Sequence, residues 1–321
     1  MTDARVKVSV TILAYNHERF IADAIEGVLA QNTDFPYEVV VIDDGSRDGT
    51  RDVIGRYWER HRDRIRVLLN RHNIGARASI VRAYRACRGR YVASLDGDDY
   101  WVCPDKLQRQ ATFLDDHPDC ALCFHSVRAV WDEERQPPVL MRPPRIQEIY
   151  TLADLLECNL IQSCSVMYRK GLFCDHPAWV YLTPAMDWAH HILHARHGDI
   201  GYIDEPMGVY RHHRNGIYSM TGEIDKLEVS MECLRRFRCA MDRTYHRTIA
   251  RSLSAHHLEL ARKCRQAGDV VRSRAYARAC IVESLRARRR PDRVLTRMLV
   301  GVYLPGLHQW LQKLFRRNCV A

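Results

Sequence analysis

The pattern of hydrophobic and polar positions over the first hundred residues predicts four buried strands. Residues 5–12 alternate with strand period, whereas residues 38–43 and 65–69 are short apolar runs rich in β-branched side chains. A fourth run, residues 90–96, ends in an aspartate. Continuous apolar strands of this kind are typical of parallel sheets that are covered on both faces.

Helical periodicity fills the three intervals between these strands. Residues 17–30 carry an apolar stripe on one face of a predicted helix. A second helix with such a stripe is predicted just after residue 50, and a third around residue 81. The alternating order of strands and helices, with right-handed crossovers, predicts an α/β fold with a doubly wound, mostly parallel sheet flanked by helices. Ligands of such sheets bind at the carboxyl ends of the strands.

Polar side chains follow three of the four predicted strands. They are Tyr15 and Asn16 after the first, Asp43 and Asp44 after the second, and Asp96, Asp98 and Asp99 after the fourth. The loop after the first strand, residues 14–20 (AYNHERF), is neither a G-x-G-x-x-G turn nor a Walker lysine loop. The sequence therefore argues against a dinucleotide cofactor and against an ATPase.

The stretch 96–99 (DGDD) concentrates three carboxylates at the end of an apolar strand. Carboxylates packed together repel one another and stay ionised only with a cation or water among them. Mg²⁺ and Mn²⁺ prefer oxygen ligands, commonly one or two carboxylates plus substrate phosphates. An isolated D-x-D would indicate a solvated acidic turn, but the strand-end position favours half of a metal site that a diphosphate completes.

A second acidic loop, residues 44–49 (DGSRDG), begins like the calcium-binding loop of an EF-hand. Its twelfth position is Gly55 rather than a bidentate glutamate, and a strand precedes it where an EF-hand has a helix. We therefore expect no calcium site in this loop.

The composition is that of a globular protein with a positive net charge. The 321 residues are 46% hydrophobic and carry a formal net charge of +10, and no run of 18 or more apolar residues occurs. We expect one large core with a smaller module, and a cytoplasmic protein without a signal peptide. The 12 cysteines are scattered along the chain. We expect the close pair, Cys120 and Cys123, to be buried thiols of a strand rather than a metal or redox site.

Further along the chain, residues 162–170 read as a strand and a helix follows. Thr183 is a natural N-cap and Pro184 suits the first helical position, so Asp187 falls in the first turn. The helix dipole favours an ionised carboxylate there, as a general base requires, although such an aspartate taken alone reads as a capping charge.

Four histidines crowd the same predicted helix: His190, His191, His194 and His197. His190 and His194 have i, i+4 spacing, but the intervening glutamate of an H-E-x-x-H zinc site is absent. A polar helix face is therefore favoured over a metal site.

Four ordered segments, residues 8–31, 39–50, 73–101 and 104–124, together resemble the nucleotide-sugar-binding half of a glycosyltransferase of family 2 with the GT-A fold. The resemblance is dense over residues 5–125 and continues more loosely to about residue 220. It implies an inverting enzyme that uses a nucleotide-sugar donor and a divalent metal.

The resemblance also implies roles for individual residues. Tyr15, Asn16 and Asp44, with Asp43 beside it, would hold the nucleoside, and an aspartate that accepts from the N3–H of uracil favours a UDP-sugar. The D-x-D motif corresponds either to Asp96 and Asp98, around Gly97, or to Asp98 and Asp99, and would bind Mg²⁺ or Mn²⁺. The remaining implied residues are Arg77, Arg211 and His213 toward the diphosphate or metal, and Asp187 as the base that deprotonates the acceptor hydroxyl.

These observations predict a GT-A domain over residues 1–222, with nucleotide-sugar binding in 1–125 and the acceptor side and base in 126–222. Residues 223–321 read as a basic helical region with one hairpin of tetratricopeptide type at about 250–288, turning at Gly268 and Asp269. Its end, residues 293–317, is either an interfacial anchor on anionic lipid or a docked helix. Most of the surplus positive charge lies in this region. Because no RNA-binding or helix-turn-helix signature accompanies it, this charge does not indicate nucleic-acid binding.

The sequence thus predicts a metal-dependent, inverting transfer of sugar to a saccharide or lipid-linked acceptor in polysaccharide or glycolipid biosynthesis, at the inner face of the membrane. One alternative is a catalytically silent nucleotide-sugar-binding or scaffold protein, against which the intact aspartates argue. The other is a nucleotidyltransferase, which would need a glycine-rich basic loop after the first strand.

Overall fold

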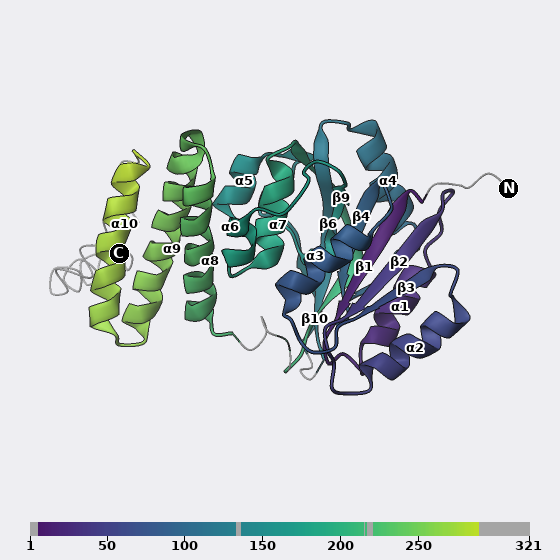
Figure 1. Cartoon of the computed structure of the whole chain (residues 1–321). Helices are drawn as coiled ribbons and strands as arrows, with labels where there is room; N and C mark the ends of the chain where they lie inside the picture. The colour runs from purple at the N-terminus through teal and green to yellow at the C-terminus, as the bar shows by residue number, and fades with distance from the viewer. Residues whose placement is uncertain (1–5, 133–135, 215, 217–220, 289–321) are drawn as a thin grey trace, which may run out of the picture. The chain divides into compact units, whose positions relative to one another are not determined.

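The computed structural model describes residues 6–132, 136–214, 216 and 221–288. The chain divides into two compact units. Unit 1 comprises Met1–Leu155, Asn159–Tyr181 and Met186–Met220, and unit 2 comprises Leu156–Cys158, Leu182–Ala185 and Thr221–Ala321. Figure 1 shows the strands in unit 1, whereas the helices α8, α9 and α10 belong to unit 2.

Unit 1 is built on one mixed sheet with the strand order β3-β2-β1-β4-β9-β6-β10-β5, to which β7 and β8 add at β6 and β10. The strands are β1 (Val8–Ala14), β2 (Tyr37–Asp43), β3 (Ile65–Leu69), β4 (Tyr91–Asp96), β5 (Tyr100–Trp101), β6 (Cys120–Trp131), β7 (Val139–Met141), β8 (Ile149–Tyr150), β9 (Met167–Arg169) and β10 (Asp199–His212).

The first four long strands are parallel, as the hydrophobic pattern predicted. In the register of β1, Ala14 lies opposite Asp43 of β2, and Leu13 lies opposite Asp96 of β4. The carboxyl ends of the three strands therefore meet at one edge of the sheet, which brings the predicted polar residues together.

Three helices between these strands, together with a fourth after β5, cover both faces of the sheet. They are α1 (Ile21–Leu29), α2 (Thr50–Arg60), α3 (Ala76–Ala86) and α4 (Lys106–Asp116). Val39 and Val41 pack in one hydrophobic cluster with residues of α1, α2 and α4, whereas Val40 and Ile42 pack on the other face with residues of α3. A strand buried on both faces explains the continuous β-branched run in β2.

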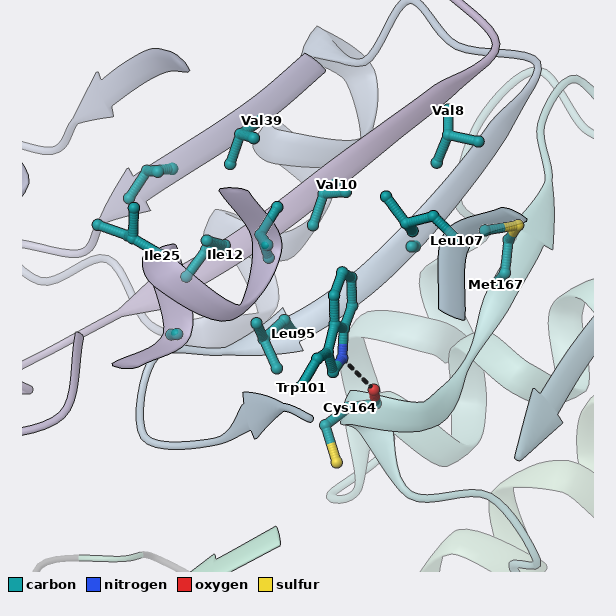
Figure 2. Packing of buried hydrophobic residues seen from close by; sticks show 14 of the residues in the cluster. Val8, Val10, Ile12, Ile25, Val39, Leu95, Trp101, Leu107, Cys164 and Met167 are labelled. Carbon is teal, nitrogen blue, oxygen red and sulfur yellow. Dashed lines mark hydrogen bonds between the residues drawn. The ribbon is translucent and has the colours of Figure 1, made fainter. Parts of the chain in front are cut away.

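Figure 2 shows the larger of these clusters, which contains Val10, Ile12 and Leu95 of the sheet together with Trp101. The indole Nε1–H of Trp101 donates to the carbonyl oxygen of Cys164 over 2.8 Å. This bond ties β5 to the segment before β9.

The second half of the sheet differs from the sequence prediction. Residues 162–170 do not form one strand, because Ser163–Ser165 is a 3-10 turn, η1, and only Met167–Arg169 pairs as β9. β9 runs antiparallel to both β4 and β6. Cys120 and Cys123 lie buried in β6, which confirms their placement in a strand, and burial raises the pKa of Cys120 to about 11.

The helices α5 (Leu152–Glu157), α6 (Ala178–Leu182) and α7 (Met186–Ala195) follow. The predicted polar histidine face on α7 is wrong, because His190, His191 and His194 are all buried. The His194 Nδ1–H donates to the His190 carbonyl, so its Nε2 accepts from the Tyr84 hydroxyl over 3.2 Å. His191 Nδ1 lies 2.7 Å from the Tyr168 hydroxyl.

Unit 2 contains α8 (Glu223–Ala240), the short turn η2 (Arg243–Tyr245), α9 (His246–Gln266) and α10 (Val270–Arg286). Gly268, with φ of 81°, turns the chain between α9 and α10, and the Asp269 side chain accepts from the Arg272 N–H to cap α10. Arg238 of α8 pairs with Glu283 of α10 at 3.0 Å. A third helix thus contacts the hairpin.

The end of the chain, residues 293–317, for which the sequence predicts either an interfacial anchor or a docked helix, lies outside the described residues. Within the part of the chain that the structure describes, no helix is both long enough and apolar enough to cross a membrane.

The buried histidines of α7 make stability depend on pH. Burial lowers the pKa of both His191 and His194 to about 3, below the ordinary value of about 6.5. A lowered folded-state pKa gives stability that is complete above pH 6.5 and is lost on acidification, by about 1.4 kcal/mol per pH unit for each group.

We therefore predict that His194→Gln, measured by urea unfolding between pH 7.5 and 5, loses less stability on acidification than the unmodified protein. Comparing the two proteins cancels the other groups that titrate in this range. The exposed His197, two residues after the end of α7, provides the control, and His197→Gln should follow the unmodified protein. Equal pH slopes for all three proteins would contradict this account.

Candidate active site

Three carboxylates lie together where β4 ends. Asp96 is the last residue of β4, and Asp98 and Asp99 form the turn into β5. The Gly97 N–H donates to the carbonyl of Leu13 over 2.8 Å, which fixes this turn against β1.

Each of the three carboxylates is held by a different segment of unit 1. Asp96 Oδ2 accepts from the Ser163 hydroxyl over 2.5 Å. Asp98 Oδ2 lies 3.0 Å from His213 Nε2 and 3.7 Å from His17 Nε2. Asp99 Oδ1 accepts from the backbone N–H of Arg211 over 2.8 Å.

The electrostatics differ among the three carboxyl groups. Burial and the charge of Asp98 raise the pKa of Asp96 to about 7 and raise that of Asp99 well above its ordinary value. Burial also acts against ionisation of Asp98, but the His213 hydrogen bond and the charges of His17 and His213 lower its pKa overall. The negative charge of the cluster is therefore most stable on Asp98.

The second acidic pair, after β2, is held inside its own loop. Asp43 Oδ2 accepts from Arg51 Nε over 2.6 Å and from the Ser46 N–H over 3.2 Å, and Asp43 is fully buried. Asp44 Oδ1 accepts from Asn70 Nδ2 over 2.8 Å and from the Ile74 N–H over 2.9 Å. The Asp43 carboxylate thus stabilises the loop after β2, while the Asn70 side chain fixes the orientation of the Asp44 carboxylate.

The loop after β1 is bound to the loop after β2. Asn16, with φ of 57°, donates its N–H to the Ser46 hydroxyl over 3.0 Å, and its side-chain oxygen accepts from the Arg47 N–H over 2.9 Å. Tyr15 is 37% exposed beside it. Tyr15 is thus the residue of this loop whose ring is open to a ligand.

The two predicted arginines lie differently from one another. The Arg211 guanidinium pairs with Asp23 over 2.8 Å and lies 4.8 Å from the ring centroids of both Phe20 and Tyr100. The structure brings the backbone of Arg211, not its guanidinium, to the carboxylates. Arg77 is exposed in the first turn of α3, which follows Gly75.

Asp187 lies in the first turn of α7, as predicted. The predicted helix start was wrong by two residues, because Thr183 and Pro184 form a bend and α7 begins at Met186. Burial raises the pKa of Asp187, while backbone N–H groups and the Asn159 side chain oppose this shift. The charge of Asp187 in turn helps to raise the pKa of Asp96, so both belong to one electrostatic environment.

Sequence reasoning missed four residues that hold this site: His17, Asn70, Asn159 and Ser163. Each is far in sequence from the acidic residue it contacts, so no spacing rule connects them. His17 alone carried a signal, because it directly follows Tyr15 and Asn16 in the first predicted loop.

The residues around Asp98 fit a divalent cation in part. A carboxylate oxygen and an imidazole nitrogen are ligands that Mn²⁺ accepts, and Mg²⁺ uses one or two carboxylates plus substrate phosphates. Among the described residues, no three acidic, histidine or cysteine side chains converge to form a complete metal site. Asp98 and His213 could therefore hold such an ion only together with the oxygens of a ligand.

Comparison with known proteins agrees with the fold described above. The family model described as glycosyl transferase family 2 matches residues 9–175, and the chain belongs to this family. An uncharacterized protein of Mycobacterium tuberculosis (strain H37Rv) is 38% identical over 216 residues, which are 66% of this chain and 60% of the relative. The putative teichuronic acid biosynthesis glycosyltransferase TuaG of Bacillus subtilis is 34% identical over 170 residues, 53% of this chain and 65% of TuaG. The chain thus spans less than two thirds of either relative.

Two solved structures share the architecture. TarS (residues 1–349) of S. aureus in complex with UDP-GlcNAc superimposes with a TM-score of 0.61 at 18% identity, covering 94% of this chain and 92% of TarS. The mannosyltransferase PcManGT of Pyrobaculum calidifontis, in complex with GDP-Man and Mn²⁺, gives 0.55 at 17% identity, covering 88% of each chain. Both likenesses confirm the predicted GT-A fold.

The turn that carries the carboxylates has room only for glycine at its second position. A Cβ atom at Gly97 would lie 2.8 Å from His17 Nδ1 and 3.0 Å from the Leu13 carbonyl oxygen. We predict that Gly97→Ala displaces this turn and lowers the free energy of unfolding by about 1–3 kcal/mol, the usual cost of overpacking.

Gly55 in the interior of α2 is the matched control, because a Cβ atom there meets nothing within 4 Å. Gly55→Ala should raise the free energy of unfolding by about 0.5–1 kcal/mol. Urea unfolding measures both variants, and a Gly97→Ala protein as stable as Gly55→Ala would contradict the crowding at this turn.

Proposed function

We propose that the protein is an inverting glycosyltransferase that moves a sugar from a nucleoside-diphosphate donor, a UDP-sugar, to a hydroxyl of a saccharide or lipid-linked acceptor. One observation carries this proposal. In a family 2 domain, the carboxylates of residues 96–99 and the helix-capping carboxylate of Asp187 share one electrostatic environment at the end of β4.

The donor side of the proposal rests on the loops after β1 and β2. The Tyr15 ring is open for stacking on a base, and the Asp44 carboxylate, oriented by Asn70 and the Ile74 N–H, can accept from the N3–H of uracil. The TarS complex with UDP-GlcNAc supports a uracil nucleotide, whereas the PcManGT complex with GDP-Man makes guanine the competing base.

The diphosphate would lie at the turn after β4. Asp98 and His213 would hold Mg²⁺ or Mn²⁺ there, and such an ion supplies the positive charge that a diphosphate leaving group requires. The PcManGT complex with Mn²⁺ supports this choice of ions. Asp96 would contact the nucleotide, and Asp99, held by the backbone of Arg211, would keep the turn in place.

Asp187 would act as the general base. Its carboxylate takes the proton of the acceptor hydroxyl while that oxygen bonds to the anomeric carbon and the bond to the diphosphate oxygen breaks on the opposite face. The name of TuaG, a teichuronic acid glycosyltransferase, supports an acceptor in polysaccharide synthesis. The basic sequence of residues 286–317 supports action at the cytoplasmic face of a membrane.

Replacing the base should separate catalysis from donor binding. General-base catalysis is worth about 10²–10⁴-fold in rate, so we predict that Asp187→Asn lowers kcat by that factor and leaves the affinity for nucleoside diphosphate unchanged. Steady-state turnover and calorimetry measure the two quantities. Full activity of Asp187→Asn would remove Asp187 from the mechanism.

Titration calorimetry with UDP, GDP and dTDP tests the donor site. We predict that UDP binds most tightly, that chelation of divalent metal weakens binding, and that Asp98→Ala removes the metal effect. Tightest binding of GDP would replace uracil with guanine in the proposal. No binding of any of the nucleotides would favour a scaffold protein over a transferase.

A further inference from the structure

We propose that Ser163 is a positioning residue for the nucleotide donor, because its hydroxyl orients the carboxylate of Asp96 toward the ligand. This inference rests on the proposed function. It concerns the 3-10 turn η1, Ser163–Ser165, to which neither the sequence pattern nor the proposed chemistry gives a role.

The contact is direct and specific. The Ser163 hydroxyl donates to Asp96 Oδ2 over 2.5 Å. In the proposal, this bond fixes the carboxylate so that its other oxygen is available to the ligand. Asp98 and Asp99 have anchors elsewhere, from His213 and from the Arg211 N–H. Since Asp96 and Asp98 repel one another, an unanchored Asp96 would turn away from its neighbour.

The turn that carries Ser163 is fixed to the same part of the core as the carboxylates. The Trp101 indole donates to the Cys164 carbonyl over 2.8 Å, as Figure 2 shows. The Gln110 side chain donates to the Ser165 carbonyl over 2.9 Å. The Ser94 N–H, two residues before Asp96, donates to the Val166 carbonyl over 3.2 Å. These three bonds hold η1 beside the end of β4, so the position of the Ser163 hydroxyl is set before a ligand binds.

The same turn provides a matched control. Ser165 is fully buried, and its hydroxyl donates to the Gln162 carbonyl within the turn over 2.7 Å, away from the carboxylates. Removing the Ser165 hydroxyl costs one hydrogen bond inside η1, while the three bonds described above still hold the turn; removing the Ser163 hydroxyl releases Asp96. The two variants therefore separate stability of the turn from positioning of the carboxylate.

The experiment compares Ser163→Ala, Ser163→Thr and Ser165→Ala with the unmodified full chain, by UDP calorimetry and by donor turnover. A hydrogen bond to a charged group contributes enough to change an equilibrium about 10- to 100-fold. We expect Ser163→Ala to raise the dissociation constant of UDP and the donor KM by about tenfold or more. Its kcat should stay within about twofold, because the contact is made before and during the reaction alike.

Ser163→Thr keeps a hydroxyl and should restore most of the affinity, and Ser165→Ala should bind UDP normally even if its melting temperature falls. The inference is overturned if Ser163→Ala binds UDP like the unmodified protein. It is also overturned if Ser163→Ala lowers kcat without raising KM, or if Ser165→Ala loses the same affinity. If the unmodified protein binds no nucleotide, the proposed function itself fails, which is a distinguishable result.

Discussion

The repulsion among the three carboxylates at the end of β4 is the constraint on which the rest of the site depends. Three acidic groups in one turn stay together only if each is anchored and a cation or proton offsets their charge. The fold meets this condition with hydrogen bonds from η1 to Asp96, from His213 after β10 to Asp98, and from the backbone of β10 to Asp99. His17, after β1, lies 3.7 Å from Asp98. In the proposed function, a divalent metal ion bound to the diphosphate of the donor supplies the offsetting positive charge.

The local patterns in the first hundred residues sufficed to predict the parallel half of the sheet. β2 is a continuous apolar run because α1, α2 and α4 cover one of its faces and α3 the other. Because parallel strands end at the same edge of a sheet, this pattern also predicted that Asp44 and Asp96 lie at one edge. These features depend on hydrophobic periodicity, which can be read from the sequence without knowing which distant residues come into contact.

Features that depend on distant partners were not predictable. The α7 histidines look polar in sequence, but Tyr84 and Tyr168 supply hydroxyl partners that allow burial. The Arg211 guanidinium looks free to meet a diphosphate, but Asp23 pairs with it. Residues 163–165 look like strand, yet the bonds from Trp101 and Gln110 fit a 3-10 turn. In each case the deciding contact crosses more than twenty residues of sequence, so no local rule reveals it.

The central claim is that the turn at residues 96–99 holds a metal-bound nucleoside diphosphate. A crystal structure of the protein grown with UDP and Mn²⁺ tests it most directly. The account predicts the ion bound to the Asp98 carboxylate at about 2 Å, as expected for a carboxylate ligand, with the diphosphate on the ion and the uracil against Asp44. A nucleotide bound away from β4, or an ion that does not touch Asp98, would contradict it.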